Sequence, residues 1–276
     1  MILWGMGISQ HVHGTDNARC LIALALLTGQ IVRPGTGLHP LRGQNNVQGA
    51  SDAGLIPMMY PDYQRVASPQ VRQEFERLWE TTLPSEPGLT VVEIIDAIAA
   101  GQVRGMYVMG ENPAMSDPDA RHAREALARL DCLVVQDIFL TETAALADVV
   151  LPASAFPEKT GSFTNTDRTV QLGRQALQPP GEARQDLWII EQMARGLGLS
   201  WSYSGPQAVF EEMRRVMPSI AGITWQRLEL ESAVTYPCEA EGDPGEPVVF
   251  TRRFPTETGR ARLVPADLIA AAEQPD

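Results

Sequence analysis

Short β-rich runs alternate with helix-forming segments through the middle of the chain, and this alternation restricts the fold more than any other feature. Residues 103–109, 132–135 and 148–151 are rich in Val, Leu and Met, and amphipathic stretches separate them. Parallel strands need such crossover segments, whereas antiparallel strands can be joined by tight turns. The pattern therefore predicts an α/β protein built on a parallel sheet.

Polar residues follow each predicted strand at its carboxyl end. The first strand is followed by Gly110, Glu111 and Asn112, the second by Gln136 and Asp137, and the third leads to Ser154. Ligands of parallel α/β sheets bind in the crevice beyond these strand ends. We therefore predict one binding site from the three ends. Glu111 and Asn112 follow a strand and a glycine, which favours a nucleotide-binding role over a surface role.

Helix signals flank this region. Thr90 and Glu93 form a capping box before an apolar run that Gly101 ends, and Ser68-Pro69 opens another predicted helix. We expect one further helix to begin at Asp117-Pro118 and two others to span 141–147 and 206–217. Asp186 is predicted to cap a helix, and ligand binding is an alternative role for it.

The N-terminal residues predict a strand, a glycine turn and a helix in succession. Ile2 to Trp4 read as a buried strand, and helical periodicity follows Thr15, with Thr15 or Asp16 as the cap. This arrangement exposes backbone N–H groups to a phosphate. Met6, Gly7 and Gln10 are accordingly candidate cofactor-binding residues, although such a turn can also merely connect the two elements.

The segment 42–49, RGQNNVQG, places one guanidinium beside four side-chain amides, with glycines near both ends. Arg can grip a planar carboxylate with two parallel hydrogen bonds, which Lys cannot do. Each amide offers a donor and an acceptor. We interpret the segment as a loop that binds a polar ligand; a plain polar surface loop is the alternative.

Composition excludes several classes of protein. The net charge of −12 argues against nucleic-acid binding, and no apolar run approaches the ~20 residues that span a bilayer. Cys20, Cys132 and Cys238 are far apart and form no CxxC pair, so we predict no metal or iron–sulfur site. No P-loop or nucleophile-elbow motif is present. We expect reduced thiols and a cytoplasmic location.

The motifs together resemble the catalytic alpha subunit of molybdenum-dependent formate dehydrogenases, which carry a bis(molybdopterin guanine dinucleotide) cofactor. The resemblance runs through 4–10 (WGMGISQ), 42–49, 110–113 (GENP), 136–143 (QDIFLTET), 148–154 (DVVLPAS), 158–165 (EKTGSFTN) and 254–256 (FPT). These motifs occur in the family's order and cover nearly the whole chain. Residues 11–15 and 57–63 look most like the soluble, NAD-linked type.

The resemblance implies roles for individual residues. Arg42 would position formate, with pairing to a cofactor phosphate as the alternative, and Gln44 would lie beside it at the pterin. Gln10 would face the cofactor. Asp137 or Asp186 would bind guanine or ribose, because a carboxylate can accept both donors of guanine. Ser116, Gln136 and Ser154 are supported by register with the family.

The resemblance also implies Rossmann-like domains of the molybdopterin oxidoreductase (formate dehydrogenase/DMSO reductase) fold, incomplete at both ends. We expect one cofactor-binding domain to end within 1–44, a second over 45–156, and a mixed helical segment over 157–276. An iron–sulfur cluster and the molybdenum ligand would lie upstream, and a flavin/iron–sulfur partner would reduce NAD. The segment alone should be inactive. A cofactor-free scaffold of a respiratory-type complex is the alternative.

Overall fold

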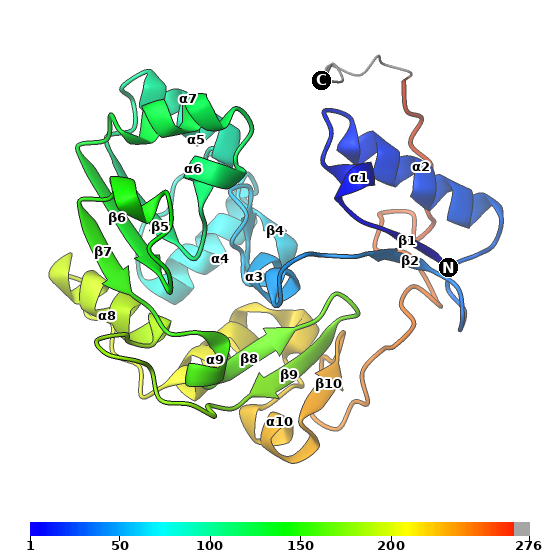
Figure 1. The fold of residues 1–276 in the computed structure, drawn as a ribbon. Coiled ribbons are helices and arrows are strands. Elements are labelled where there is room, and N and C mark those ends of the chain that lie inside the picture. Colours follow the sequence, from blue (N-terminus) through cyan, green and yellow to red (C-terminus); the bar gives the residue numbers. More distant parts are fainter. Residues whose placement is uncertain (268–276) are drawn as a thin grey trace. The chain divides into compact units, whose positions relative to one another are not determined.

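Residues 1–267 are described by a computed structural model, in which the chain divides into two compact units (Figure 1). Unit 1 comprises Met1–Asp52, Phe163–Gln171 and the chain from Met217 onward, and unit 2 comprises Ala53–Ser162 and Leu172–Val216. This division by packing is not sequential along the chain. The expected domains 1–44, 45–156 and 157–276 remain a prediction about cofactor binding. The tail 268–276 lies outside the described residues.

The predicted parallel sheet forms the centre of unit 2. Strands β5 (Gly105–Met109), β6 (Cys132–Asp137) and β7 (Val149–Pro152) lie in the order β5-β6-β7, and both pairings are parallel (green in Figure 1). Strand β6 continues through Gln136 and Asp137, two residues beyond its predicted end. The backbone of these two polar residues is therefore fixed by pairing with β7.

One face of this sheet packs against helices. Alternating residues of β5 and β6 point to it, and Val108, Leu133 and Val135 are buried there with Ala144. Helices α5 (Val91–Ala99) and α7 (Ala120–Leu127) pack together through Ile95, Ile98, Ala114, Ala123, Ala126 and Leu127. The alanines on α7 allow close approach of the two helices, and these clusters fix the sheet that carries the predicted binding residues.

The helix signals gave mixed results in unit 2. The capping box is present, since the Glu93 carboxylate accepts hydrogen bonds from the Thr90 backbone N–H (2.8 Å) and hydroxyl (2.7 Å). Helix α7, however, begins after the cap Asp119 rather than at Asp117, because Asp119 in the left-handed region accepts from the His122 N–H. The short helix α6 (Pro113–Ser116) follows the predicted site residues Gly110, Glu111 and Asn112.

Other elements complete unit 2. The expected helix over 141–147 is reduced to a 3-10 turn, η2 (Ala144–Leu146). Helix α4 (Pro69–Trp79) begins after the cap Ser68 as predicted. The remaining elements are β3 (Met59–Tyr60), η1 (Pro61–Tyr63), β4 (Gln64–Arg65), η3 (Phe156–Glu158), α8 (Asp186–Gly196) and α9 (Pro206–Val216). Tyr60 stacks on Phe75 with ring centroids 4.6 Å apart.

The N-terminal part of unit 1 contains the predicted strand and helix with two corrections. Strand β1 (Ile2–Trp4) pairs in parallel with β2 (Leu38–Pro40), but Leu3 is 54% exposed, so the strand is not buried. Met6 and Gly7 lie in a short helix, α1 (Met6–Ser9), rather than in a turn. Helix α2 (Gly14–Leu27) begins one residue before Thr15, with His13 at the cap position.

A small antiparallel sheet has most of its residues in unit 1, whereas Gly161, Ser162, Leu172 and Gly173 at the strand ends are assigned to unit 2. Strands β8 (Gly161–Thr164), β9 (Thr169–Gly173) and β10 (Ala233–Thr235) have the order β10-β9-β8, and β10 leads back from α10 (Trp225–Glu231). Helix α3 (Val47–Asp52) and the turn η4 (Pro218–Ile220) also belong to unit 1. Within residues 1–267, no helix combines the length and apolar character needed to cross a membrane.

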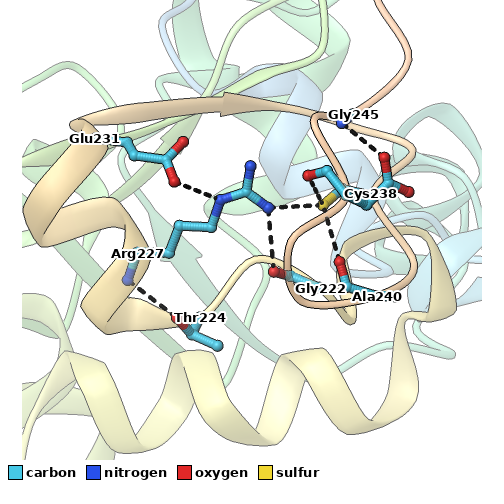
Figure 2. Close-up of polar contacts among 8 residues, drawn as sticks. Gly222, Thr224, Arg227, Glu231, Cys238, Ala240 and Gly245 are labelled. Atoms are coloured by element: carbon cyan, nitrogen blue, oxygen red, sulfur yellow. Dashed lines mark hydrogen bonds and ion pairs between the residues drawn. The ribbon is translucent and has the colours of Figure 1, made fainter.

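Cys238 lies buried in the loop that follows β10 (Figure 2). Its thiol is fully buried and accepts a hydrogen bond from the Arg227 guanidinium at 3.2 Å, and the carbonyl of Asp243 lies 3.4 Å away. Arg227 also donates to Glu231 on the same helix at 2.8 Å. Burial raises the pKa of the Cys238 thiol and outweighs the nearby guanidinium. Cys238 is therefore a structural thiol, whereas Cys20 and Cys132 are exposed.

Candidate functional site

The amide-rich loop lies in unit 1 between β2 and α3, and its first half is unpaired. Arg42, Gln44 and Asn45 are exposed. None of these three side chains has a hydrogen-bond or ion-pair partner in the part of the chain that the structure describes. A guanidinium and two amides are thus available to a ligand at the same turn of the backbone.

The second half of the loop faces the protein instead. Asn46 has a left-handed backbone (φ 64°), and its side-chain oxygen accepts the Thr164 N–H at 2.9 Å. A Cβ at Gly49 would come within 2.1 Å of that oxygen, so glycine is required for this close approach. The Gln48 amide donates to Asp52 at 2.7 Å and to the Tyr236 hydroxyl at 3.1 Å. The four amides therefore divide into two free and two anchored groups.

A small polar pocket lies against the loop. It has a volume of about 280 Å³, and its lining consists of His39, Arg42, Gln44, Asn45, Asn46, Gln48, Thr164, Asn165, Thr166 and Asp167. Arg42 contributes a positive charge to this lining, and Asp167 contributes a negative charge. The size and polarity suit a small planar anion that needs both a cation and amide donors.

Arg168, next to this lining, was not recognised from the sequence. Its backbone is left-handed (φ 70°), and its guanidinium donates to the carbonyls of Tyr236, Glu246 (2.9 Å) and Pro247 (3.1 Å). Burial lowers the pKa of Arg168, although nearby oxygens oppose the shift. The role of Arg168 has no signal in the local sequence, because the three carbonyls that accept its hydrogen bonds lie 68, 78 and 79 residues away.

In unit 2, Asn112 organises the loop after β5. Its side-chain oxygen accepts the Thr143 N–H (3.1 Å) and hydroxyl (2.8 Å), and its amide donates to Glu142 at 2.7 Å. This hydrogen bond lowers the pKa of Glu142. The Asn112 side chain thus ties two strand ends together. Gly110 has φ +65°, Glu111 is exposed, and the exposed Ser116 hydroxyl donates to the Asn112 carbonyl at 3.1 Å.

Gln136 and Asp186 lie in one polar chain. The Gln136 side chain is fully buried, donates to Asp186 Oδ1 at 2.6 Å and accepts a hydrogen bond from Tyr107. The second Asp186 oxygen pairs with Lys159, whose ammonium also donates to the Ser154 carbonyl at 3.1 Å. Burial, followed by the Asp186 charge, raises the pKa of Tyr107. Lys159 was missed from the sequence, although it lies within the EKTG motif.

Asp186 does not cap helix α8 as predicted. The cap position is Gln185, and Asp186 is the first helical residue, where its negative charge is favourable at the helix N-terminus. Its carboxylate instead reaches Gln136 and Lys159. Both oxygens are engaged, so any ligand would have to share them.

Ser154 and Asp137 have unused hydrogen-bonding capacity at the strand ends. The Ser154 side chain is 2% exposed, and its hydroxyl has no partner within residues 1–267. Asp137 Oδ1 accepts the N–H groups of Ile138 (2.6 Å) and Phe139 (3.2 Å), which leaves Oδ2 without a partner in the described chain. A buried hydroxyl without a partner is rare and indicates a missing ligand or water.

An adjoining pocket follows these strand ends. It measures about 510 Å³ and is mainly apolar, with lining from Ile138, Phe139, Pro152, Ala153, Ala155, Glu158, Pro180, Glu182 and Ala183. The predicted residues Met6, Gly7 and Gln10 lie apart in sequence, in or just after α1 of unit 1, and all three are exposed. Within residues 1–267, no cluster of three or more His, Cys, Asp or Glu could hold a metal ion.

The sequence and the fold define the class of protein. The model of the molybdopterin oxidoreductase family matches residues 1–195, which is more than half of the chain. The chain therefore belongs to the molybdopterin oxidoreductase family, and the parallel α/β architecture predicted from the alternation of strands and helices is confirmed.

Two relatives show which proteins of this family the chain resembles. The alpha subunit of the F420-dependent formate dehydrogenase of Methanocaldococcus jannaschii is 46% identical over 277 residues, which cover 100% of this chain and 41% of that protein. Formate dehydrogenase H of Escherichia coli is 37% identical over 276 residues, covering 99% of this chain and 39% of the relative. The chain thus spans about two fifths of the length of these relatives.

The chain also aligns with a solved structure. Acetylene hydratase from Pelobacter acetylenicus aligns with a TM-score of 0.47 and 20% identity, over 60% of this chain and 24% of that structure.

Proposed function

We propose that the chain is part of the catalytic subunit of a formate dehydrogenase and that its Arg42 loop binds formate. The observation that carries the proposal is the unpaired guanidinium of Arg42 beside the unpaired amides of Gln44 and Asn45, at a pocket of about 280 Å³. Formate has only two oxygens for recognition, and the guanidinium fork fits both of them. Names of relatives such as formate dehydrogenase H support formate as the substrate.

Within this proposal, Arg42 positions formate rather than stabilising its transition state. The carboxylate charge of formate disappears as CO₂ forms, so the attraction to the guanidinium weakens along the reaction. The fork fixes the direction of the C–H bond instead, and orientation alone can change a rate by orders of magnitude. The amides of Gln44 and Asn45 would supply further donors and limit the volume open to larger acids.

We further propose that the strand ends of unit 2 hold a molybdenum cofactor of the bis(molybdopterin guanine dinucleotide) type. The residues fit such a group, because Ser154 keeps a buried hydroxyl without a partner and Asp137 keeps one free oxygen. The proposed contacts in unit 2 are Gly110, Glu111, Asn112, Ser116, Gln136, Asp137, Ser154 and Asp186. Within unit 1, the residues proposed to bind cofactor are Met6, Gly7, Gln10 and Gln44. The bound cofactor supplies the two-electron acceptor for formate oxidation.

Electrons would leave through other parts of a longer protein and a partner subunit. We propose that a [4Fe–4S] cluster lies outside this segment and that a flavin-containing partner reduces a soluble acceptor in the cytoplasm. The resemblance of residues 11–15 favours NAD as that acceptor, whereas several relatives are F420-dependent formate dehydrogenases, which favours F420. Reduction of each acceptor by the purified complex decides between them. The segment alone should show no formate oxidation even when supplied with cofactor.

The Arg42→Ala variant, made in the full-length protein with its partner, tests the formate-binding role. We expect kcat/KM for formate to fall by about two orders of magnitude or more, because a misplaced substrate loses orientation. Molybdenum content should stay near normal. Arg42→Lys should recover only part of the activity, since an ammonium cannot form the bidentate pair.

Arg19→Ala is the matched control, because Arg19 is a surface arginine of the same unit that pairs with Asp16. It should leave formate kinetics unchanged. Loss of molybdenum from Arg42→Ala would make Arg42 a cofactor anchor instead. A wild-type complex that binds cofactor without oxidising formate would favour the scaffold role.

A further inference from the structure

Tyr236 and Asp52 form a buried hydrogen-bonded pair behind the Arg42 loop. The Tyr236 hydroxyl donates to Asp52 Oδ2 at 2.7 Å, and the Gln48 amide donates to Asp52 Oδ1 at 2.7 Å. Asp52 is 4% exposed and Tyr236 is 9% exposed. The pair joins residues 184 positions apart, and the Gln48 amide also reaches the Tyr236 hydroxyl at 3.1 Å.

Through its backbone, Tyr236 also binds Arg168, the residue that directly follows the lining stretch 164–167. Its N–H donates to the Arg168 carbonyl at 3.0 Å, and its own carbonyl accepts the Arg168 guanidinium. Arg168 directly follows Thr166 and Asp167, which line the pocket. One residue therefore connects to both sides: its side chain to the loop through Gln48 and Asp52, and its backbone to the turn at 166–168.

We propose that Tyr236 and Asp52 are positioning residues that set the spacing across the Arg42 pocket. This inference rests on the proposed function and adds a determinant of substrate size to it. A buried carboxylate is costly unless it keeps its donors, so the pair has one favourable arrangement. That arrangement fixes Gln48 and, through the short helix α3, the end of the loop. A fixed spacing admits formate and disfavours bulkier carboxylic acids.

The test uses Tyr236→Phe in the full-length protein with its partner. We expect KM for formate to rise about tenfold, comparable with losing one hydrogen bond to a charged group, while kcat changes much less. Inhibition by acetate should strengthen relative to inhibition by nitrate, a planar anion close to formate in size. Amide exchange at Ala50 and Thr164 should speed up, because both N–H groups donate to Asn46 in the anchored half of the loop.

Tyr203→Phe is a closely matched control. Tyr203 donates its hydroxyl to a carboxylate, Glu212, at 2.8 Å, but it belongs to unit 2. Its removal should lower thermal stability without changing formate KM, acetate inhibition or exchange at Ala50 and Thr164. If Tyr236→Phe does not fold, Asp52→Asn preserves shape while weakening the acceptor, and the same readouts apply.

The outcomes separate this inference from the proposed function. If Arg42→Ala loses formate turnover while Tyr236→Phe and Asp52→Asn keep wild-type KM and exchange, the positioning role is overturned and formate binding stands. If Arg42→Ala keeps its formate kinetics, the proposed function fails. Faster exchange in Tyr236→Phe but not in Tyr203→Phe would then still support the positioning of the loop.

Discussion

Gly222 shows how a single residue can fix a loop. Its N–H donates to the Cys238 carbonyl at 2.8 Å, and its carbonyl lies 3.5 Å from an Arg227 donor (Figure 2). A Cβ at this position would lie 2.2 Å from the Ala240 carbonyl oxygen. The Ala240 atoms cannot retreat easily, because the carbonyl oxygen, the carbonyl carbon and the nitrogen that the Cβ would meet all belong to the backbone. The absence of a side chain is thus a condition for closing the loop over the buried Cys238 thiol.

Gly222→Ala should therefore destabilise unit 1. We expect a loss of about 2 kcal/mol in the free energy of unfolding, the usual size for an overpacked site, measured by chemical denaturation. The control is Gly196→Ala at the end of α8, where nothing lies within 4 Å of the added Cβ. That change should stabilise by up to about 1 kcal/mol. Equal stability for the two variants would contradict the close packing.

The residue types of the 42–49 loop predicted only in part which of its side chains are free to contact a ligand. Arg42 and Gln44 could be singled out, because a permanent charge and an amide in a glycine-bounded loop have few structural uses. Asn46 and Gln48 have the same chemistry in the sequence but are anchored by Thr164 and by Tyr236. These two partners lie more than a hundred residues away, and only the Gln48–Asp52 contact is local, so the sequence around the loop could not separate the free amides from the anchored ones.

At the scale of elements, helix α5 illustrates a local signal that the structure confirms. The Glu93 carboxylate accepts both the N–H and the hydroxyl of Thr90, and these two bonds lower the pKa of Glu93. The cap orients a helix whose Ile95 and Ile98 belong to the core under the parallel sheet. Thus a four-residue pattern at the surface supports the sheet that carries the candidate cofactor residues.

Thr90→Ala should weaken this cap. We expect a loss of about 1 kcal/mol at neutral pH, the typical cost of an N-cap replacement. Because the pKa of Glu93 in the folded protein is lowered, the contribution of its carboxylate is complete above the ordinary pKa of a glutamate and is lost as pH falls through the lowered pKa. The difference between wild type and Thr90→Ala should therefore shrink in acid.

Denaturation midpoints followed from pH 7 down through the acid range would measure this effect. Thr81→Ala provides the comparison, because Thr81 is exposed. It should have little effect at any pH. A difference that stays constant or grows in acid would mean that the Glu93 carboxylate does not contribute to the cap.

Elements were easier to predict than their ends. Strong periodicity and caps located β5, β6, α4 and α9 within about two residues, whereas α7 begins after Asp119, because Asp119 rather than Asp117 caps its first turn. The pairing of β1 with β2 was missed. The run Ile2–Trp4 carries a strand signal of its own, but its partner Leu38–Pro40 is three residues long and lies thirty-six positions away, so no local pattern indicates that the two runs pair.

At the scale of the whole molecule, the chain passes repeatedly between two packing units. Unit 1 takes residues from three separate stretches of sequence, and unit 2 takes residues from two. Within unit 2, Gln136 from the first stretch is buried against Asp186 from the second. A cut between the two stretches would leave a buried amide without its partner, so a segment that ends between them is not expected to fold on its own.

Fragments test this organisation directly. Residues 53–216 contain all of unit 2, and we expect them to unfold in one cooperative thermal transition with dispersed amide resonances. Residues 45–156, the segment expected from sequence to form a domain, lack Lys159 and Asp186 and should remain largely unfolded. Circular dichroism and two-dimensional NMR would report both results. Matching melting points for the two fragments would show that α8 is dispensable.

The division of the 42–49 loop into a free half and an anchored half has a consequence for engineering. A library confined to Arg42, Gln44 and Asn45 could explore new small-acid substrates while the underlying support stays intact. Randomising Asn46, Gln48 or Gly49 would mostly yield misfolded clones, since those positions face Thr164, Asp52 and Tyr236. Within one short segment, the positions that can be varied to change the substrate are thus different from the positions that must be kept for folding.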